Sequence, residues 1–322
     1  MDFLRGAAVV LVVLLHAGLT VDGQSGAFDN ALRPYRMPML MALSGLLLQR
    51  SLAKGTAAYV LGKVRGVLWP WLLWSAVMAA LFSERFRDDP VGFLAVGTHM
   101  WFLGALAFSY ALALATRRVP TWGVAIGLFL AADLLQDHFG ALTTYLWYSA
   151  FFFIGATLKP WMDRWLAARW GWAALFTGIA VAGAVAQVPH GLHIVFGPDQ
   201  ALLSVVGILA AIRLAAALPR VAPVRAVEWI GRHSIVTYLA HSALLVPVGR
   251  VVAEIGLTGA VATTANFIVV LALALVLTWA RPHTEWLYRL PLPDLSALPN
   301  PADLRRRNEP AEESRPGMPA RL

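Results

Sequence analysis

The chain has 322 residues, of which 59% are hydrophobic and only 14% are charged. Its mean hydropathy of +0.65 is far above that of a water-soluble globular protein, which argues against a soluble enzyme. The formal net charge of +8 would suggest a nucleic-acid partner in a soluble chain, but membrane topology explains it here, so none is expected. The absence of cysteine excludes disulfides, thiolate metal sites and a cysteine acyl-enzyme.

Ten apolar runs of about the length needed to cross a bilayer follow one another along residues 1–281. They predict an all-α, polytopic transmembrane domain over 1–281, with helices near 4–19, 32–48, 67–82, 100–115, 122–135, 143–158, 173–188, 201–218, 235–253 and 257–279. The last segment, 282–322, is rich in proline and charge. Such a composition cannot bury a core, so this segment is predicted to be a disordered cytoplasmic tail.

Basic residues divide unevenly between the two sides of this predicted bundle. With ten spans both termini share one side, where 21 of the 26 lysines and arginines lie, and five lie on the other side. Because cytoplasmic loops are enriched in lysine and arginine, both termini are predicted to be cytoplasmic. We expect a multi-pass protein of the plasma membrane.

The first predicted helix carries two polar residues that suit chemistry across a membrane. Arg5 and His16 are eleven positions apart, which places them on one helix face and separates them by roughly 16 Å along the axis. Arginine offers a planar fork of donors for phosphate, and a neutral imidazole at depth could take a proton from an attacking hydroxyl. The alternative is that Arg5 only marks the cytoplasmic end while His16 hydrogen-bonds a neighbouring helix. The pair on one face favours a functional role.

Four segments form a recognisable series of motifs. In order they are Asp2-Phe-Leu-Arg-Gly-Ala-Ala with His16 following, the second-helix segment MPMLMALSG (37–45), the segment HMWFL (99–103), and GRHSIVTYLAH (231–241). Together they resemble the integral-membrane acyltransferase 3 family, which includes enzymes that O-acetylate or O-succinylate extracytoplasmic sugars. The resemblance covers residue 2 to about residue 279.

This resemblance implies a membrane O-acyltransferase. Such an enzyme moves an acetyl or other short acyl group from cytoplasmic acyl-CoA, expected here to be acetyl-CoA, to a hydroxyl of a cell-envelope carbohydrate or lipid-linked glycan. It implies that His16 is the catalytic histidine, that Arg5 and Asp2 belong to the catalytic set with it, and that Arg5 also helps to hold the coenzyme. Direct attack assisted by His16 is the simplest course, and a transient acyl-imidazole remains open.

A function of another class also fits these residues. In a transporter or flippase of a lipid-linked or anionic solute, Arg5 and His16 would form a binding or proton-relay path. The sequence shows neither paired broken helices nor halves with matching motifs. A partner protein is possible, since relatives often have a soluble acceptor-handling domain, and the true start of the chain could lie upstream of Met1.

Further site residues have two interpretations each. Lys63 and Arg65 could meet the coenzyme phosphates or simply follow the positive-inside rule. Arg36 could bind an acidic sugar or polarise the reacting carbonyl, or it could pair with Asp22 or Asp29, which is slightly favoured.

Four further residues are candidates for contact with the acceptor. Ser44 could carry an acyl group, although close helix packing is favoured. His99 with Trp101 stands out only through the family motif, and His241 either partners His16 or satisfies a buried polar contact. No metal site is expected, because His190 and His193 lie in a loop without a nearby acidic ligand.

Overall fold

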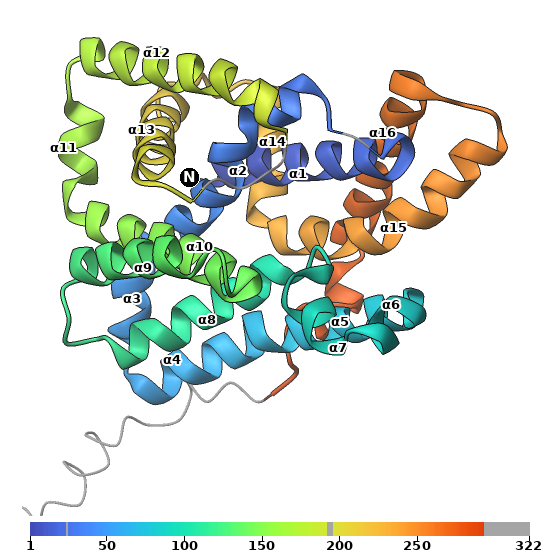
Figure 1. The fold of residues 1–322 in the computed structure, drawn as a ribbon, viewed down its shortest axis with the longest axis horizontal. Helices are drawn as coiled ribbons and strands as arrows, with labels where there is room; N and C mark the ends of the chain where they lie inside the picture. The colour runs from blue at the N-terminus through green and yellow to red at the C-terminus, as the bar shows by residue number, and fades with distance from the viewer. Residues whose placement is uncertain (24, 192–195, 293–322) are drawn as a thin grey trace, which may run out of the picture. The chain divides into compact units, whose positions relative to one another are not determined.

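The computed structural model describes residues 1–23, 25–191 and 196–292 (Figure 1). Within these ranges every regular element is a helix, which confirms the predicted all-α class. The α-helices are α1 (Asp2–Asp22), α2 (Ala27–Gly45), α3 (Leu48–Leu52), α4 (Thr56–Lys63), α5 (Trp69–Leu81), α6 (Ser83–Asp88), α7 (Pro90–Gly92), α8 (Trp101–Ala115), α9 (Thr121–Leu135), α10 (Gly140–Leu158), α11 (Met162–Ala167), α12 (Trp170–Gln187), α13 (Pro198–Ala215), α14 (Ala222–Arg232), α15 (Ser234–Glu254) and α16 (Gly259–Trp279). Short π- or 3₁₀-helical segments are η1 (Val64–Leu68), η2 (Phe93–Gly97), η3 (Lys159–Trp161), η4 (Val188–His190), η5 (Arg281–His283) and η6 (Glu285–Leu287).

Each predicted apolar run overlaps a helix, but fewer than ten helices in the described ranges qualify as membrane spans. Seven are long and apolar enough to cross a bilayer. An eighth arises if Pro90–Gly97 and Trp101–Ala115, which are bent by 84° at their junction, form one broken span. Helix α9 has only 15 residues, and α2 carries three charged side chains among its 19 residues. A multi-pass membrane protein is therefore supported, while ten spans and cytoplasmic termini stay predictions.

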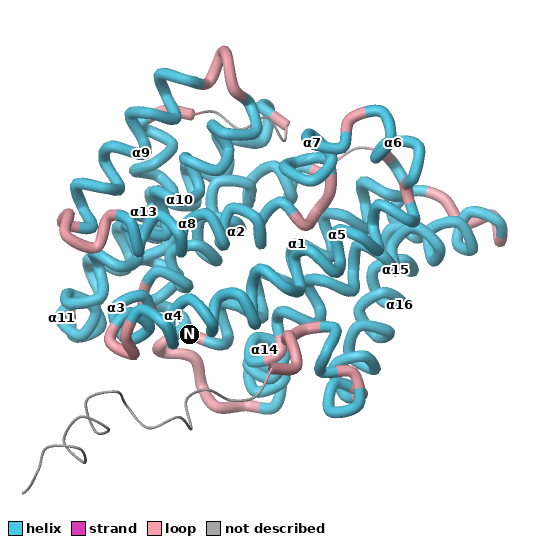
Figure 2. Tube along the Cα trace, turned by 90° about the horizontal axis from the view of Figure 1, so that it is seen from below, coloured by secondary structure: helices cyan, strands magenta, loops and turns pink. Residues whose placement is uncertain are grey.

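Helix α1 lies among α2, α14, α15 and α16 (Figure 2). It crosses α14 in direct backbone contact at two glycines. A Cβ atom on Gly6 would lie 2.0 Å from the carbonyl oxygen of Val227, and one on Gly231 would lie 1.8 Å from that of Asp2. Only glycine allows two backbones to approach so closely. This crossing fixes the end of α1 that carries Asp2 and Arg5.

Helices α2 and α10 cross in the same way. A Cβ atom on Gly45 would lie 1.8 Å from the carbonyl oxygen of Phe152, and one on Gly155 would lie 2.0 Å from that of Ala42. Small residues at a membrane-helix crossing allow the extensive van der Waals contact on which association in lipid depends. The Gly45 end of the second-helix motif is thus a packing element.

The packed part of the chain continues past residue 281 to Pro291. The Leu290 amide donates to the carbonyl oxygen of Arg65 (3.0 Å), and the Trp74 indole donates to that of Leu287 (3.0 Å). The Tyr288 ring is buried and stacks on Trp74 with centroids 6.0 Å apart. The first residues assigned to the tail are therefore part of the fold, and residues 293–322 lie outside the described residues.

The α2–α10 crossing gives a first testable prediction. Gly155→Ala places a methyl group against the backbone of Ala42, and overpacking of this kind typically costs about 1–3 kcal/mol. We expect a lower thermal unfolding midpoint for the purified protein in detergent. The matched control is Gly127→Ala in α9, where a Cβ atom would meet nothing within 4 Å. An unchanged midpoint for Gly155→Ala would contradict the close crossing.

Candidate functional site

The N-terminal turn of α1 holds Arg5 between two helices. One Arg5 Nη atom lies 3.3 Å from Asp2 Oδ1, and the other donates to the carbonyl oxygen of Leu43 in α2 at 3.3 Å. Both charged side chains remain partly exposed. Asp2 therefore orients Arg5 while leaving it accessible to an anionic ligand.

A second cation shares the neighbour Tyr110 with Arg5. Lys63 Nζ lies 3.8 Å from the ring centroid of Tyr110 in α8 and 5.5 Å from that of Tyr59, a cation–π arrangement. The Tyr59 hydroxyl donates to the Tyr110 carbonyl oxygen at 2.8 Å, which ties α4 to α8. Arg5 is near enough to Tyr110 for an electrostatic interaction. Arg5 and Lys63 thus both interact with Tyr110. Lys54 is a further cation near Lys63.

Arg65 is used differently from Lys63. Its side chain is 9% exposed, and its Nε donates to the carbonyl oxygen of Leu290 at 3.1 Å. Residues two positions apart in a helix differ by about 200°, so Lys63 and Arg65 face different neighbours. The structure places Arg65 as an anchor of the C-terminal segment, and its role in coenzyme binding stays a prediction.

Three histidine rings from distant parts of the chain meet at the other end of α1. The ring centroids of His16 and His99 are 3.8 Å apart, those of His16 and His241 are 5.3 Å apart, and those of His99 and His241 are 5.7 Å apart. His16 belongs to α1, His99 to the bend before α8 and His241 to α15. The buried Nδ1 atoms of His16 and His99 have no hydrogen-bond partner in the described part of the chain. The histidine cluster, defined as these three residues, unites three predicted site residues.

Backbone carbonyl groups and Tyr238 hold this cluster in place. The His241 ring is fully buried, and its Nδ1 lies at hydrogen-bond distance from the carbonyl oxygen of Tyr238 in the preceding turn. The Tyr238 hydroxyl in turn donates to the carbonyl oxygen of His99. His241 therefore lies beside His16 and also satisfies a buried polar contact, and its role in binding the acceptor stays a prediction.

Arg36 is a buried cation beside the cluster. The residue is only 3% exposed, and its Nη atoms contact both Oδ1 and the backbone oxygen of Asp29 at 2.9 Å. The predicted pairing with Asp29 is confirmed. Arg36 also lies close enough to His16 to act on it electrostatically. A paired cation near a buried imidazole can stabilise negative charge that develops there.

Ser44 and Trp101 complete the set of predicted residues. Ser44 Oγ donates to the carbonyl oxygen of Leu40 in its own helix at 2.8 Å, which fits the packing interpretation. The Trp101 ring lies 4.8 Å from that of Tyr148. A small cavity of about 20 Å³ borders Tyr148, with Gln200 and Ser204 in its lining. Aromatic and polar groups therefore lie together next to the bend that carries His99.

Tyr59, Tyr110 and Tyr238 are residues of the site that the sequence patterns did not indicate. Tyr59 and Lys63 are four positions apart, a spacing that puts them on one helix face and could have signalled their contact. Tyr238 lies within a quoted motif, but its contact with His99 spans 139 positions and depends on tertiary structure. In the described ranges no set of three histidine or acidic side chains has metal-binding geometry, and His193 lies outside these ranges.

Fold and site together define a polytopic helical membrane protein with a cationic group at one end of α1 and a histidine cluster near the other. The acyltransferase 3 family model, described as an acyltransferase domain, matches residues 1–280. The chain therefore belongs to this family of membrane acyltransferases. No curated protein and no solved structure matches it.

The Arg36–Asp29 pair gives a second prediction. Asp29→Asn leaves a buried guanidinium without its counter-charge, a change that typically costs about 3–5 kcal/mol. We expect a clear fall in the free energy of unfolding, and partial recovery in the double variant Asp29→Asn/Arg36→Met. This is checked by denaturant unfolding in detergent.

The control for this prediction is the exposed pair of Arg289 and Glu285, whose charged atoms are 3.8 Å apart. Exposed pairs contribute about 0–1 kcal/mol, so Glu285→Gln should change stability little. If Asp29→Asn and Glu285→Gln lower the free energy of unfolding equally, burial does not increase the stability contribution of the Arg36–Asp29 pair, and the prediction is wrong.

Proposed function

We propose that the protein is a plasma-membrane O-acyltransferase. It transfers an acetyl or other short acyl group from cytoplasmic acyl-CoA, with acetyl-CoA as the expected donor, to a hydroxyl of a cell-envelope carbohydrate or lipid-linked glycan. The observation that carries the proposal is that α1 connects the Arg5–Lys63 group to the histidine cluster in an acyltransferase-family chain. Transport of an anionic solute would use the same two residues but leaves the family match unexplained.

The donor is proposed to bind at the Arg5–Lys63 group. Coenzyme A carries phosphates at one end and its thioester at the end of a long flexible arm. Guanidinium and ammonium groups around Tyr110 offer charge-assisted hydrogen bonds to those phosphates, and Asp2 holds Arg5 in place. With the phosphates there, the arm can extend along α1 so that the thioester reaches His16.

The histidine cluster is proposed to handle the proton. Three imidazoles at these separations cannot all carry positive charge without strong repulsion, so the cluster retains a neutral ring that accepts a proton. His16 takes the proton from the acceptor hydroxyl while that oxygen attacks the thioester carbonyl carbon. The carbon–sulfur bond then breaks, and the leaving thiolate takes the proton from His16. The products are the O-acyl ester and free coenzyme A.

Arg36 and the aromatic groups are proposed to act on the reacting centre and the acceptor. The buried Arg36 guanidinium lies near His16 and favours the negative charge on the tetrahedral carbonyl oxygen. Trp101 packs against Tyr148, and Tyr148, Gln200 and Ser204 border a cavity of about 20 Å³, which has room for about one water. These groups are proposed to border the acceptor.

The test uses purified protein in liposomes with radiolabelled acetyl-CoA and a cell-envelope glycan fraction. Loss of a general base typically lowers the rate by about 100- to 10,000-fold, which is the effect expected for His16→Ala on label transfer. Arg5→Ala should mainly raise the KM for acetyl-CoA. The matched control is His138→Ala, because His138 is exposed outside the cluster and should leave transfer unchanged.

The outcomes separate the alternatives. Label that stays on the protein when no acceptor is present would indicate an acyl-imidazole in place of direct transfer. Full transfer by His16→Ala would remove His16 from the chemistry. If wild-type protein neither binds acetyl-CoA nor moves label from it, the proposed function fails.

A further inference from the structure

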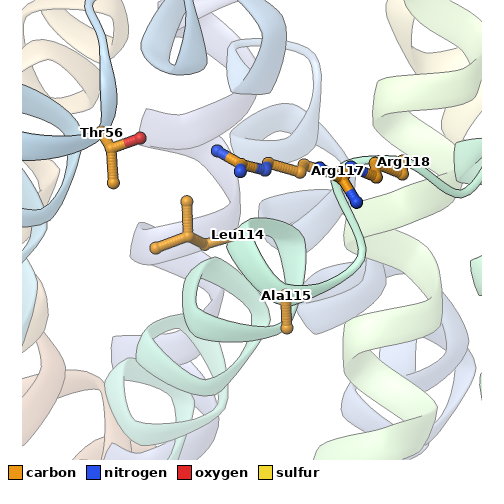
Figure 3. A pocket seen from close by; sticks show the side chains of 5 residues that line it. All are labelled: Thr56, Leu114, Ala115, Arg117 and Arg118. Atoms are coloured by element: carbon orange, nitrogen blue, oxygen red, sulfur yellow. The ribbon is translucent and has the colours of Figure 1, made fainter.

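A separate cavity of about 410 Å³ opens between α4 and the C-terminal end of α8 (Figure 3). Its lining consists of Thr56, Leu114, Ala115, Arg117 and Arg118. Both arginines are exposed, and neither forms an ion pair or side-chain hydrogen bond within the described residues. The positive-inside rule explains arginines in a loop, but it does not explain a cavity beside them.

The chemistry of the lining selects for an anion. Two adjacent guanidinium groups repel each other, and the lining contains no carboxylate to offset them. An oxyanion with several acceptor oxygens would supply the acceptors that these guanidinium groups lack. A phosphate group is the ligand that matches this charge and geometry.

The cavity adjoins the donor site described above. Leu114 follows Tyr110 by four positions in α8, and Thr56 precedes Tyr59 by three positions in α4. Both steps correspond to about one helical turn, or roughly 5–6 Å. The cationic groups therefore continue from the cavity through Lys63 to Arg5, and α1 leads on to the histidine cluster.

We propose that this cavity binds the 3′-phosphate at the nucleotide end of the acyl-CoA donor. The inference rests on the proposed function, which places the coenzyme at the Arg5–Lys63 group. Coenzyme A carries a pyrophosphate and, beyond it, a ribose 3′-phosphate. With the pyrophosphate at Arg5 and Lys63, the 3′-phosphate faces Arg117 and Arg118. The headgroup of an anionic phospholipid shares this chemistry and is the other source of phosphate to be tested.

The experiment compares coenzyme A with 3′-dephospho-coenzyme A in equilibrium binding to the full chain. The protein is held in nanodiscs of phosphatidylcholine. For wild-type protein we expect removal of the 3′-phosphate to weaken binding by about 10-fold or more, the scale of a charge-assisted hydrogen bond. For the double variant Arg117→Gln/Arg118→Gln we expect the two ligands to bind within about twofold of each other, since the partner of the phosphate is gone.

The matched control removes the same charge elsewhere. Arg164 lies in α11 and Arg169 directly precedes α12; neither lines the cavity, and Arg164 contacts the Trp161 ring. The double variant Arg164→Gln/Arg169→Gln should keep the wild-type preference for coenzyme A. An equal weakening of both ligands by Arg117→Gln/Arg118→Gln, with the preference intact, would mean that the arginines act only through the general field, and would overturn the proposal.

Two further results distinguish the possible failures. If wild-type protein binds both coenzymes equally while Arg117→Gln/Arg118→Gln retains less phosphatidylglycerol on purification, the phosphate belongs to a lipid and the nucleotide assignment is wrong. If wild-type protein binds neither coenzyme, the proposed function itself fails. If only the cavity assignment is wrong, the wild-type protein still binds coenzyme A, and it binds 3′-dephospho-coenzyme A with the same affinity.

Discussion

The cost of placing a polar side chain among apolar helices governs the arrangement of this site. An unpaired charge or an unsatisfied polar group is expensive where water is scarce, so such groups are kept beside one another. Arg36 is paired with Asp29, Lys63 lies over Tyr110, and His241 contacts a backbone carbonyl. Buried polar atoms without a hydrogen-bond partner occur on nine residues of the described ranges: His16, Trp71, Ser75, His99, Thr143, Arg213, Thr237, Asn266 and Tyr288. For the Nδ1 atoms of His16 and His99, which lie at the proposed reacting centre, a substrate would supply the missing contact.

Two kinds of contact keep the site rigid. Glycines at the α1–α14 and α2–α10 crossings let backbones touch, which sets the position of each helix along its neighbour. Long-range hydrogen bonds from tyrosines then connect the helices that carry functional groups, as Tyr59 does for α8 and Tyr238 does for the bend at His99. The α1–α14 crossing thus fixes the helix that carries His16, and the Tyr238 hydrogen bond connects the helix of His241 to the bend with His99.

Local periodicity was sufficient to predict the helices and the common face of Arg5 and His16, since both follow from the geometry of one helix. It could not predict that η1 turns Arg65 toward Leu290, 225 positions away. Nor could it show that His99 lies against His16, because that contact depends on a bend of 84° before α8. The family motifs named His16, His99 and His241 separately, and only tertiary structure brings them together. Apolar runs alone could not establish the number of spans. Helix α9 has only 15 residues, and α2 carries the charged pair of Arg36 and Asp29, so neither qualifies as a span by length and composition.

The origin of the three histidines has a consequence for biosynthesis. His16 lies in the first helix, and His241 lies in α15, after which α16 is the one remaining long helix of the described residues. A nascent chain that has been synthesised as far as α12 holds Arg5, Lys63 and His16 but still lacks the final ring. The complete cluster therefore forms only when nearly the whole domain has been synthesised and the early and late helices have met. Truncated or misinserted chains cannot contain the intact centre, which couples its formation to the completion of membrane insertion.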